Sequence, residues 1–230
     1  MFNNVKLTNR LSFLIGAIAV FLLMVSLVYY GVNNWFRITR VVVSGNVPNL
    51  TEDLVTKLIS NRLTGTYFTL NIASVQKEFE KVAWVKSVHV EREFPDTIHV
   101  NIVEYVPIIN LGHGKLLSKE KFIFKGYDIE KKLPLFTTPD SQIENALLVY
   151  EQLKPFMLLH NFQLNSLEYS GVGLTKIGFK NELANLNITM CSNNISSELV
   201  VLNKYWEQVF QIESKITLIN MCYKNALAIR

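Results

Sequence analysis

The chain has 230 residues, of which 49% are hydrophobic and 18% are charged, and its formal net charge is +4. This composition excludes a disordered or collagen-like chain, and so small a positive charge gives no support for nucleic-acid binding. Two cysteines are too few for a disulfide-dense scaffold, so the chain must bury a hydrophobic core of its own.

The first feature in chain order is an uncharged apolar stretch from Leu11 to Tyr30. As a helix it is about 30 Å long, the thickness of the hydrocarbon core of a bilayer. A buried core helix would carry a polar face, and a cleaved signal peptide a shorter apolar region with an A-x-A-like site. We therefore expect a cytoplasmic tail over residues 1–10 and an uncleaved transmembrane signal-anchor helix over residues 11–30.

The charges that flank this stretch barely decide its direction, because Lys6 and Arg10 precede it and Arg37 and Arg40 follow it. A tail of residues 1–10 is too short to fold, and most of the chain lies after the helix. We therefore expect the tail inside the cytoplasm and the body of the protein outside it.

Residues 36–106 have the pattern of one α+β module with the order β-α-α-β-β. A β-branched run ends at Gly45-Asn46, which predicts a strand and a turn, and Thr51 and Asn71 are suitable N-caps for two helices. Alternating segments on either side of Phe94-Pro95-Asp96 predict a hairpin. Its apolar positions, which we expect to face the helices, are Val88, Val90, Ile98 and Val100.

The other face of this hairpin carries side chains that also occur in metal sites. They are His89, Glu91, Glu93, His99 and Asn101. One face of such a sheet is normally solvated and polar, so we expect a solvated surface with no metal and no cofactor, and metal ligation is the alternative.

Residues 107–230 have the pattern of a mixed or antiparallel β-sheet domain with two helices. Short strands are predicted at 115–117 and 122–124, followed by a rigid connector, LPLFTTPD, and by a helix from Ile143 that Pro155 ends. Three alternating strands follow over 163–170, 173–179 and 183–190. A second helix then carries on one face Leu199, Leu202, Trp206 and Val209.

The final stretch, residues 215–230, is apolar at nearly every position, with only Lys224-Asn225 as a turn or bulge. Such a strand is either buried by its own helices or an edge whose unpaired backbone groups accept a partner strand. Cys191 and Cys222 both lie in this module and can pair outside the cytoplasm, but their spacing does not decide whether they do.

Trp84 to Val100 resembles the POTRA domain of the FtsQ/DivIB family of bacterial division proteins, through the run W-V-x-x-V-x-V-x-R-x-F-P-x-T-I-x-V. Three other segments carry the same resemblance: VVVSGN, residues 65–68 and Glu104. The end of the chain resembles the family ending at Tyr223, Asn225 and Ala228, and departs from it at Cys222 and Ala226. The resemblance therefore implies an FtsQ-type POTRA domain over 36–106 and an FtsQ/DivIB C-terminal β domain over 107–230.

The resemblance also implies a function. It is that of a non-enzymatic, single-pass type II scaffold of the divisome in the cell inner membrane, periplasmic for most of its length and located at the division septum. Its C-terminal edge would receive a strand of a partner resembling FtsB, in a complex that includes one resembling FtsL. The implied partner-binding residues are Tyr223, Asn225, Ala226, Leu227, Ala228 and Ile229.

Two other functions are alternatives. One is a POTRA-containing envelope protein that assembles outer-membrane or secreted substrates, and the other is a membrane-tethered envelope enzyme. The sequence contains no Gly-x-Ser-x-Gly, His-Glu-x-x-His, Walker or dinucleotide-binding motif. It therefore predicts no catalytic residues, no cofactor and no small-molecule substrate.

Overall fold

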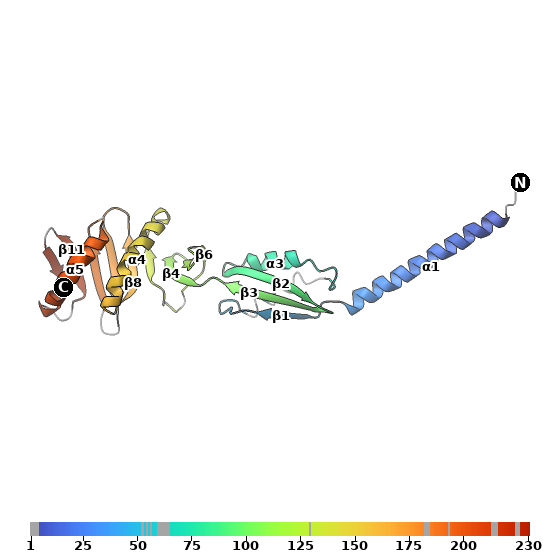
Figure 1. The fold of residues 1–230 in the computed structure, drawn as a ribbon, viewed down its shortest axis with the longest axis horizontal. Helices are drawn as coiled ribbons and strands as arrows, with labels where there is room; N and C mark the ends of the chain where they lie inside the picture. The colour runs from blue at the N-terminus through green and yellow to red at the C-terminus, as the bar shows by residue number, and fades with distance from the viewer. Residues whose placement is uncertain are drawn as a thin grey trace. The chain divides into compact units, whose positions relative to one another are not determined.

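The computed structural model describes residues 5–51, 53, 55, 57–58, 65–128, 130–181, 185–192, 194–212, 216–223 and 226–230. The chain divides into two compact units, residues 1–104, which include an N-terminal helix, and residues 105–230 (Figure 1). The α+β class expected from the sequence is confirmed.

Helix α1, Val5–Trp35, contains the uncharged stretch. Over Asn9–Trp35 it is long and apolar enough to cross a bilayer, and among the described residues it is the one helix that is. No residue in the most apolar segment of this helix is buried inside the protein. A helix that is apolar on all sides needs a covering other than water, which a bilayer supplies.

The rest of the first unit is a small sheet with a helix packed on one face. Its regular elements with complete bounds are β1 (Arg40–Ser44), α3 (Ile72–Glu80), β2 (Val85–Glu93) and β3 (Thr97–Glu104). The strand order is β1-β3-β2, with β1 parallel and β2 antiparallel to β3. The hairpin positions expected to face the helices, Val88, Val90, Ile98 and Val100, are buried. Most of the helix expected after Thr51 lies outside the described residues.

Two local contacts explain the ends of these elements. Asn71 caps α3, because its side-chain oxygen accepts a hydrogen bond from the Ser74 backbone N–H at 3.1 Å. The turn after β1 uses Gly45 at a φ of 124°, where a Cβ atom would lie 2.1 Å from the Ile102 carbonyl oxygen. Only glycine fits this turn without displacing β3.

The polar face of the β2–β3 hairpin carries two His–Glu pairs. His89 Nε2 lies 2.8 Å from Glu91 Oε1, and His99 contacts Glu93. Within the part of the chain that the structure describes, no group of three or more His, Cys, Asp or Glu side chains is arranged to hold a metal ion. The metal alternative therefore gains no support.

The turn between β2 and β3 contains a carboxylate, Asp96, through which the stability of the first unit depends on pH. The Thr39 hydroxyl donates a hydrogen bond to Asp96 Oδ2, and this bond holds the pKa of Asp96 below its ordinary value of 3.8. The hydroxyl of Thr97 and the positive charge of Arg40 act in the same direction.

Because the folded state lowers this pKa, the stabilisation is complete above the unfolded value and is lost as the pH falls through the folded value. We expect Asp96→Asn to destabilise the first unit near pH 7 and to match the wild type only once the pH falls below the lowered pKa of the folded state. Amide hydrogen exchange in β3 measures the unfolding free energy of this unit. Asp140→Asn, in the other unit, is the control, and a difference between wild type and Asp96→Asn that persists in acid would contradict this assignment.

The second unit is a mixed sheet that is covered by helices on one face. Its strands are β4 (Pro107–Gly112), β5 (Lys115–Ser118), β6 (Ile123–Lys125), β7 (Leu135–Thr137), β8 (Gln163–Tyr169), β9 (Thr175–Lys180), β10 (Asn185–Met190), β11 (Leu218–Tyr223) and β12 (Ala226–Ile229). Its helices are the short η1 (Asp140–Gln142), α4 (Ile143–Leu159) and α5 (Ile195–Ile212). Among the described residues the strand order is β12-β11-β10-β9-β8-β7-β4-β5-β6.

Three local expectations for this unit were wrong. Strand β4, Pro107–Gly112, begins directly after the hairpin, where the first strand expected from the sequence was at 115–117. The connector LPLFTTPD contains β7, which pairs in parallel with β4 and β8 and buries Phe136. Helix α4 continues through Pro155 to Leu159, because Leu153 and Phe156 are both buried and packing outweighs the one lost backbone hydrogen bond.

Two parallel connections determine where the helices lie. Helix α4 joins β7 to its parallel neighbour β8, and α5 joins β10 to its parallel neighbour β11. Parallel neighbours need such a crossover, and crossovers of one hand place both helices on the same face of the sheet. Helix α5 shows the expected apolar face, with Leu199, Leu202 and Val209 buried and Trp206 packed against the core. As a result, α5 lies beside the terminal strands.

Candidate partner-binding site

The C-terminal strand β12 forms one edge of the sheet. It pairs antiparallel with β11, and no strand of the described residues pairs with its outer side. The expectation of an edge C-terminal strand is therefore confirmed. The continuous strip expected from Tyr223 to Ile229 is instead two strands, because Tyr223 ends β11 opposite Ala226, and only Ala226–Ile229 lies on the edge.

The backbone hydrogen bonds show which groups of β12 point outward. Leu218 and Arg230 exchange two backbone hydrogen bonds, each of 3.0 Å. Since the direction of bonding alternates along an antiparallel strand, the N–H and C=O groups of Ala228 point toward β11. The corresponding groups of Leu227 and Ile229 point away from the sheet, in the position where a further strand would pair.

The side chains of the predicted contact residues divide between two faces. Tyr223 is 58% exposed, and Ala226 and Ala228 are exposed as well. Leu227 and Ile229 are half-buried and pack against the core of the unit. Asn225 lies outside the described residues.

A groove lies beside this edge, between α5 and the terminal strands, with a volume of about 700 Å³. The strands contribute Met221, Tyr223, Ala226, Leu227 and Ile229 to its lining. Helix α5 contributes Glu198, Val201, Lys204, Tyr205, Gln208 and Val209. The α5 residues were not predicted from the sequence, although the exposed Val201 and Tyr205 lie off the apolar face of that helix and were a usable signal.

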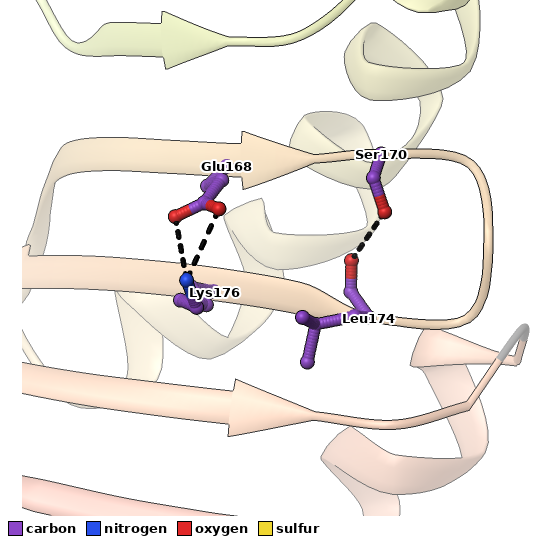
Figure 2. A network of polar contacts seen from close by, with 4 residues as sticks. All are labelled: Glu168, Ser170, Leu174 and Lys176. Atoms are coloured by element: carbon purple, nitrogen blue, oxygen red, sulfur yellow. Dashed lines mark hydrogen bonds and ion pairs between the residues drawn. The ribbon is translucent and has the colours of Figure 1, made fainter.

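The face of the sheet opposite the helices is polar. Glu168 on β8 and Lys176 on β9 lie directly opposite each other and form an ion pair at 3.0 Å, as Figure 2 shows. Further along the same hairpin the Ser170 hydroxyl donates to the Leu174 carbonyl at 3.5 Å. These polar contacts lie on the face away from the helices, whereas the groove, which α5 lines, is on the helical side of the sheet.

A disulfide bond holds the terminal strands in place. Cys191 follows β10 and Cys222 lies in β11, and the two are bonded with their Cα atoms 4.7 Å apart. The register between β11 and β12 shifts between Asn220 and Tyr223, and at this bulge the Cys222 N–H donates to Asn220 Oδ1 at 2.9 Å. The pairing that the sequence left undecided is thus formed, and it fixes the strand that supports the open edge.

The fold of the first unit has a known family counterpart. Residues 36–105 match the family described as "POTRA domain, FtsQ-type". The part of the first unit that follows α1 is therefore a POTRA domain, and the sheet with an open edge comes after it in the chain.

Several known proteins that are similar to this chain over most of its length have the same description. The chain is 20% identical to "Cell division protein FtsQ" of Neisseria gonorrhoeae over 100% of its own length and 95% of the relative's. It is 19% identical to the protein of the same description from Neisseria meningitidis, over 94% and 92% of the two lengths. The corresponding Burkholderia pseudomallei protein is 24% identical over 70% and 66%. Over much of its length the chain is thus similar to proteins described as cell division protein FtsQ.

Proposed function

We propose that this cell division protein is a non-enzymatic membrane scaffold that binds other divisome proteins by adding one of their strands to β12. Helix α1 crosses the inner membrane once, and the POTRA domain and the second unit lie in the periplasm at the division septum. The scaffold thereby links division proteins to septal peptidoglycan synthesis. Its partners at the edge resemble FtsB and FtsL.

The observation that carries this proposal is the open outer side of β12 beside a groove lined by both apolar and polar side chains. The outward N–H and C=O groups of Leu227 and Ile229 supply hydrogen bonds to any extended segment. The groove lined by α5 supplies contacts for the side chains of that segment, and Tyr223 at its rim is a residue type that often dominates binding energy. Together these features favour a peptide strand over a small molecule.

The disulfide supports the periplasmic placement. Cystine bonds persist in oxidising compartments such as the bacterial periplasm and are rare in the cytoplasm. The pairing of Cys191 with Cys222 therefore favours a location of the second unit outside the cytoplasm. This argument is independent of the flanking charges, which are nearly balanced across α1.

The proposal is tested by co-purification of the full chain with the FtsB-like and FtsL-like proteins of the same organism. We expect a stable complex, and we expect Tyr223→Ala to weaken it at least about fivefold, because the side chain is exposed at the groove and hot-spot truncations cost more than about 1 kcal/mol. Tyr127→Ala is the matched control, since Tyr127 is an exposed tyrosine that is not among the groove residues. Failure to form a complex, or equal losses for both variants, would refute the proposal.

A further inference from the structure

Four aromatic side chains of the POTRA domain form a closed cluster, here called the aromatic tetrad: Phe36, Tyr67, Phe68 and Phe94. Phe36 lies 5.4 Å from Phe68 and 5.5 Å from Phe94 between ring centroids. Tyr67 lies 5.2 Å from Phe68 and 5.6 Å from Phe94. Each ring therefore contacts two others, which fixes their positions more firmly than a single pair would.

The tetrad is held together but not covered. Phe68 is 57% exposed and Phe94 is 63% exposed, although rings of this size are usually buried. Arg92 lies 6.0 Å from the Tyr67 ring and donates a 2.6 Å hydrogen bond to the Leu70 carbonyl. Adjacent apolar rings that are left open together mark an interaction surface rather than scattered exposure.

The tetrad is joined to the end of the apolar helix. The Phe36 N–H donates to the Val32 carbonyl of α1 at 3.2 Å, and the Phe36 carbonyl accepts from the Tyr67 N–H at 2.7 Å. Phe36 thus continues the hydrogen bonding of α1 and also holds the segment that carries the rings of Tyr67 and Phe68. The tetrad cannot move far from the point where the chain leaves the helix.

Helix geometry sets the depth of that point. The apolar stretch ends at Tyr30, and five more uncharged residues to Trp35 add about 8 Å at the helical rise. The interfacial region on each side of the hydrocarbon core is about 5–8 Å deep. Trp35 and Phe36 therefore lie at the level of the lipid headgroups, where aromatic rings are favoured.

The charges around the tetrad suit the same environment. Arg37, Arg40 and Arg92 are exposed and lie within four residues of a tetrad ring in the sequence. Of the two acidic residues beside Phe94, Asp96 interacts with Arg40 and Glu93 contacts His99. Since Arg92 is engaged by the Leu70 carbonyl and Arg40 by Asp96, Arg37 is the guanidinium group that we expect to meet lipid phosphates.

We propose that the aromatic tetrad inserts into the outer interfacial layer of the bilayer and seats the POTRA domain on the membrane, a contact that rests on the proposed membrane span of α1. Its occupant is the lipid headgroup region, because the tetrad continues the surface that α1 already offers to lipid. The interaction tethers the POTRA domain near the bilayer and limits its rotation relative to α1.

Photo-crosslinking in bilayers tests this contact. The full chain is reconstituted in vesicles of phosphatidylethanolamine and phosphatidylglycerol, with p-benzoylphenylalanine in place of Phe68 or of Phe94, and lipid adducts are quantified by mass spectrometry after irradiation. We expect several-fold more lipid adduct at either position than at Phe122, an exposed phenylalanine of the second unit. Two independent probe positions guard against a variant that fails to fold.

The same probe in place of Leu22, within α1, separates the two proposals. Adducts at Leu22 with none above the Phe122 level at Phe68 and Phe94 would overturn the tetrad contact and leave the membrane span intact. Adducts from Phe68 and Phe94 to another polypeptide instead of lipid would also overturn it. Absence of lipid adducts at Leu22 would overturn the span and the tetrad contact together.

Discussion

Leu227→Pro is expected to weaken partner binding by about 100-fold while the second unit stays folded. The substitution removes the outward N–H of Leu227, a loss of about 1 kcal/mol, and the half-buried side chain beside the groove, a loss of about 2 kcal/mol. It removes no hydrogen bond of the β11–β12 ladder, since that N–H points away from β11. The measurement is the dissociation constant of the FtsB-like partner from the full chain.

The opposite edge of the same sheet provides the matched control. Ile123 lies in β6, and the bond from the Ser118 N–H to the Phe122 carbonyl places its own N–H outward by the same alternation. Ile123→Pro should leave the affinity unchanged. Leu227→Ala keeps the backbone donor and should cost about 30-fold, the side-chain share alone. An affinity that Leu227→Pro leaves intact would count decisively against strand addition at β12.

Removal of the disulfide is expected to destabilise the second unit by about 3–4 kcal/mol, from loop-closure entropy across the 31-residue separation of Cys191 and Cys222. A loss of this size lowers the Tm of a domain of this length on the order of 10 °C. The effect concentrates on the strand that supports the open edge, because Cys222 lies at the β11 bulge. Calorimetry of the full chain in detergent, with Cys191→Ser and Cys222→Ser combined, measures it.

Two comparisons make this result specific. Cys191→Ser alone should match the double variant, because either change breaks the bond. A thiol reductant should lower the Tm of the wild type and have no effect on the double variant. If hydrogen exchange showed β11 and β12 equally protected with and without the bond, the disulfide would not be what holds the edge in place.

The local patterns in the sequence predicted much of the fold because they report burial directly. Period-two alternation around Phe94-Pro95-Asp96 identified the POTRA hairpin, and helical spacing from Leu199 to Val209 identified α5. Strands β4 and β7 were missed. Strand β7 has three residues and lies among prolines, so its place between β4 and β8 depends on pairing with distant strands.

The amino-acid sequence by itself determined that the chain has an apolar membrane-length helix, an α+β module and a second β module, because each follows from local periodicity and composition. The motif from Trp84 to Val100 added the resemblance of the first module to a POTRA domain. Only the tertiary structure decided that the terminal stretch is a hairpin, that its outer strand is an edge and that α5 forms a groove beside it. The tertiary structure also decided that Cys191 meets Cys222. These features depend on which strands pair and on which face the crossovers pass, and pairing between distant segments leaves no local periodicity in the sequence.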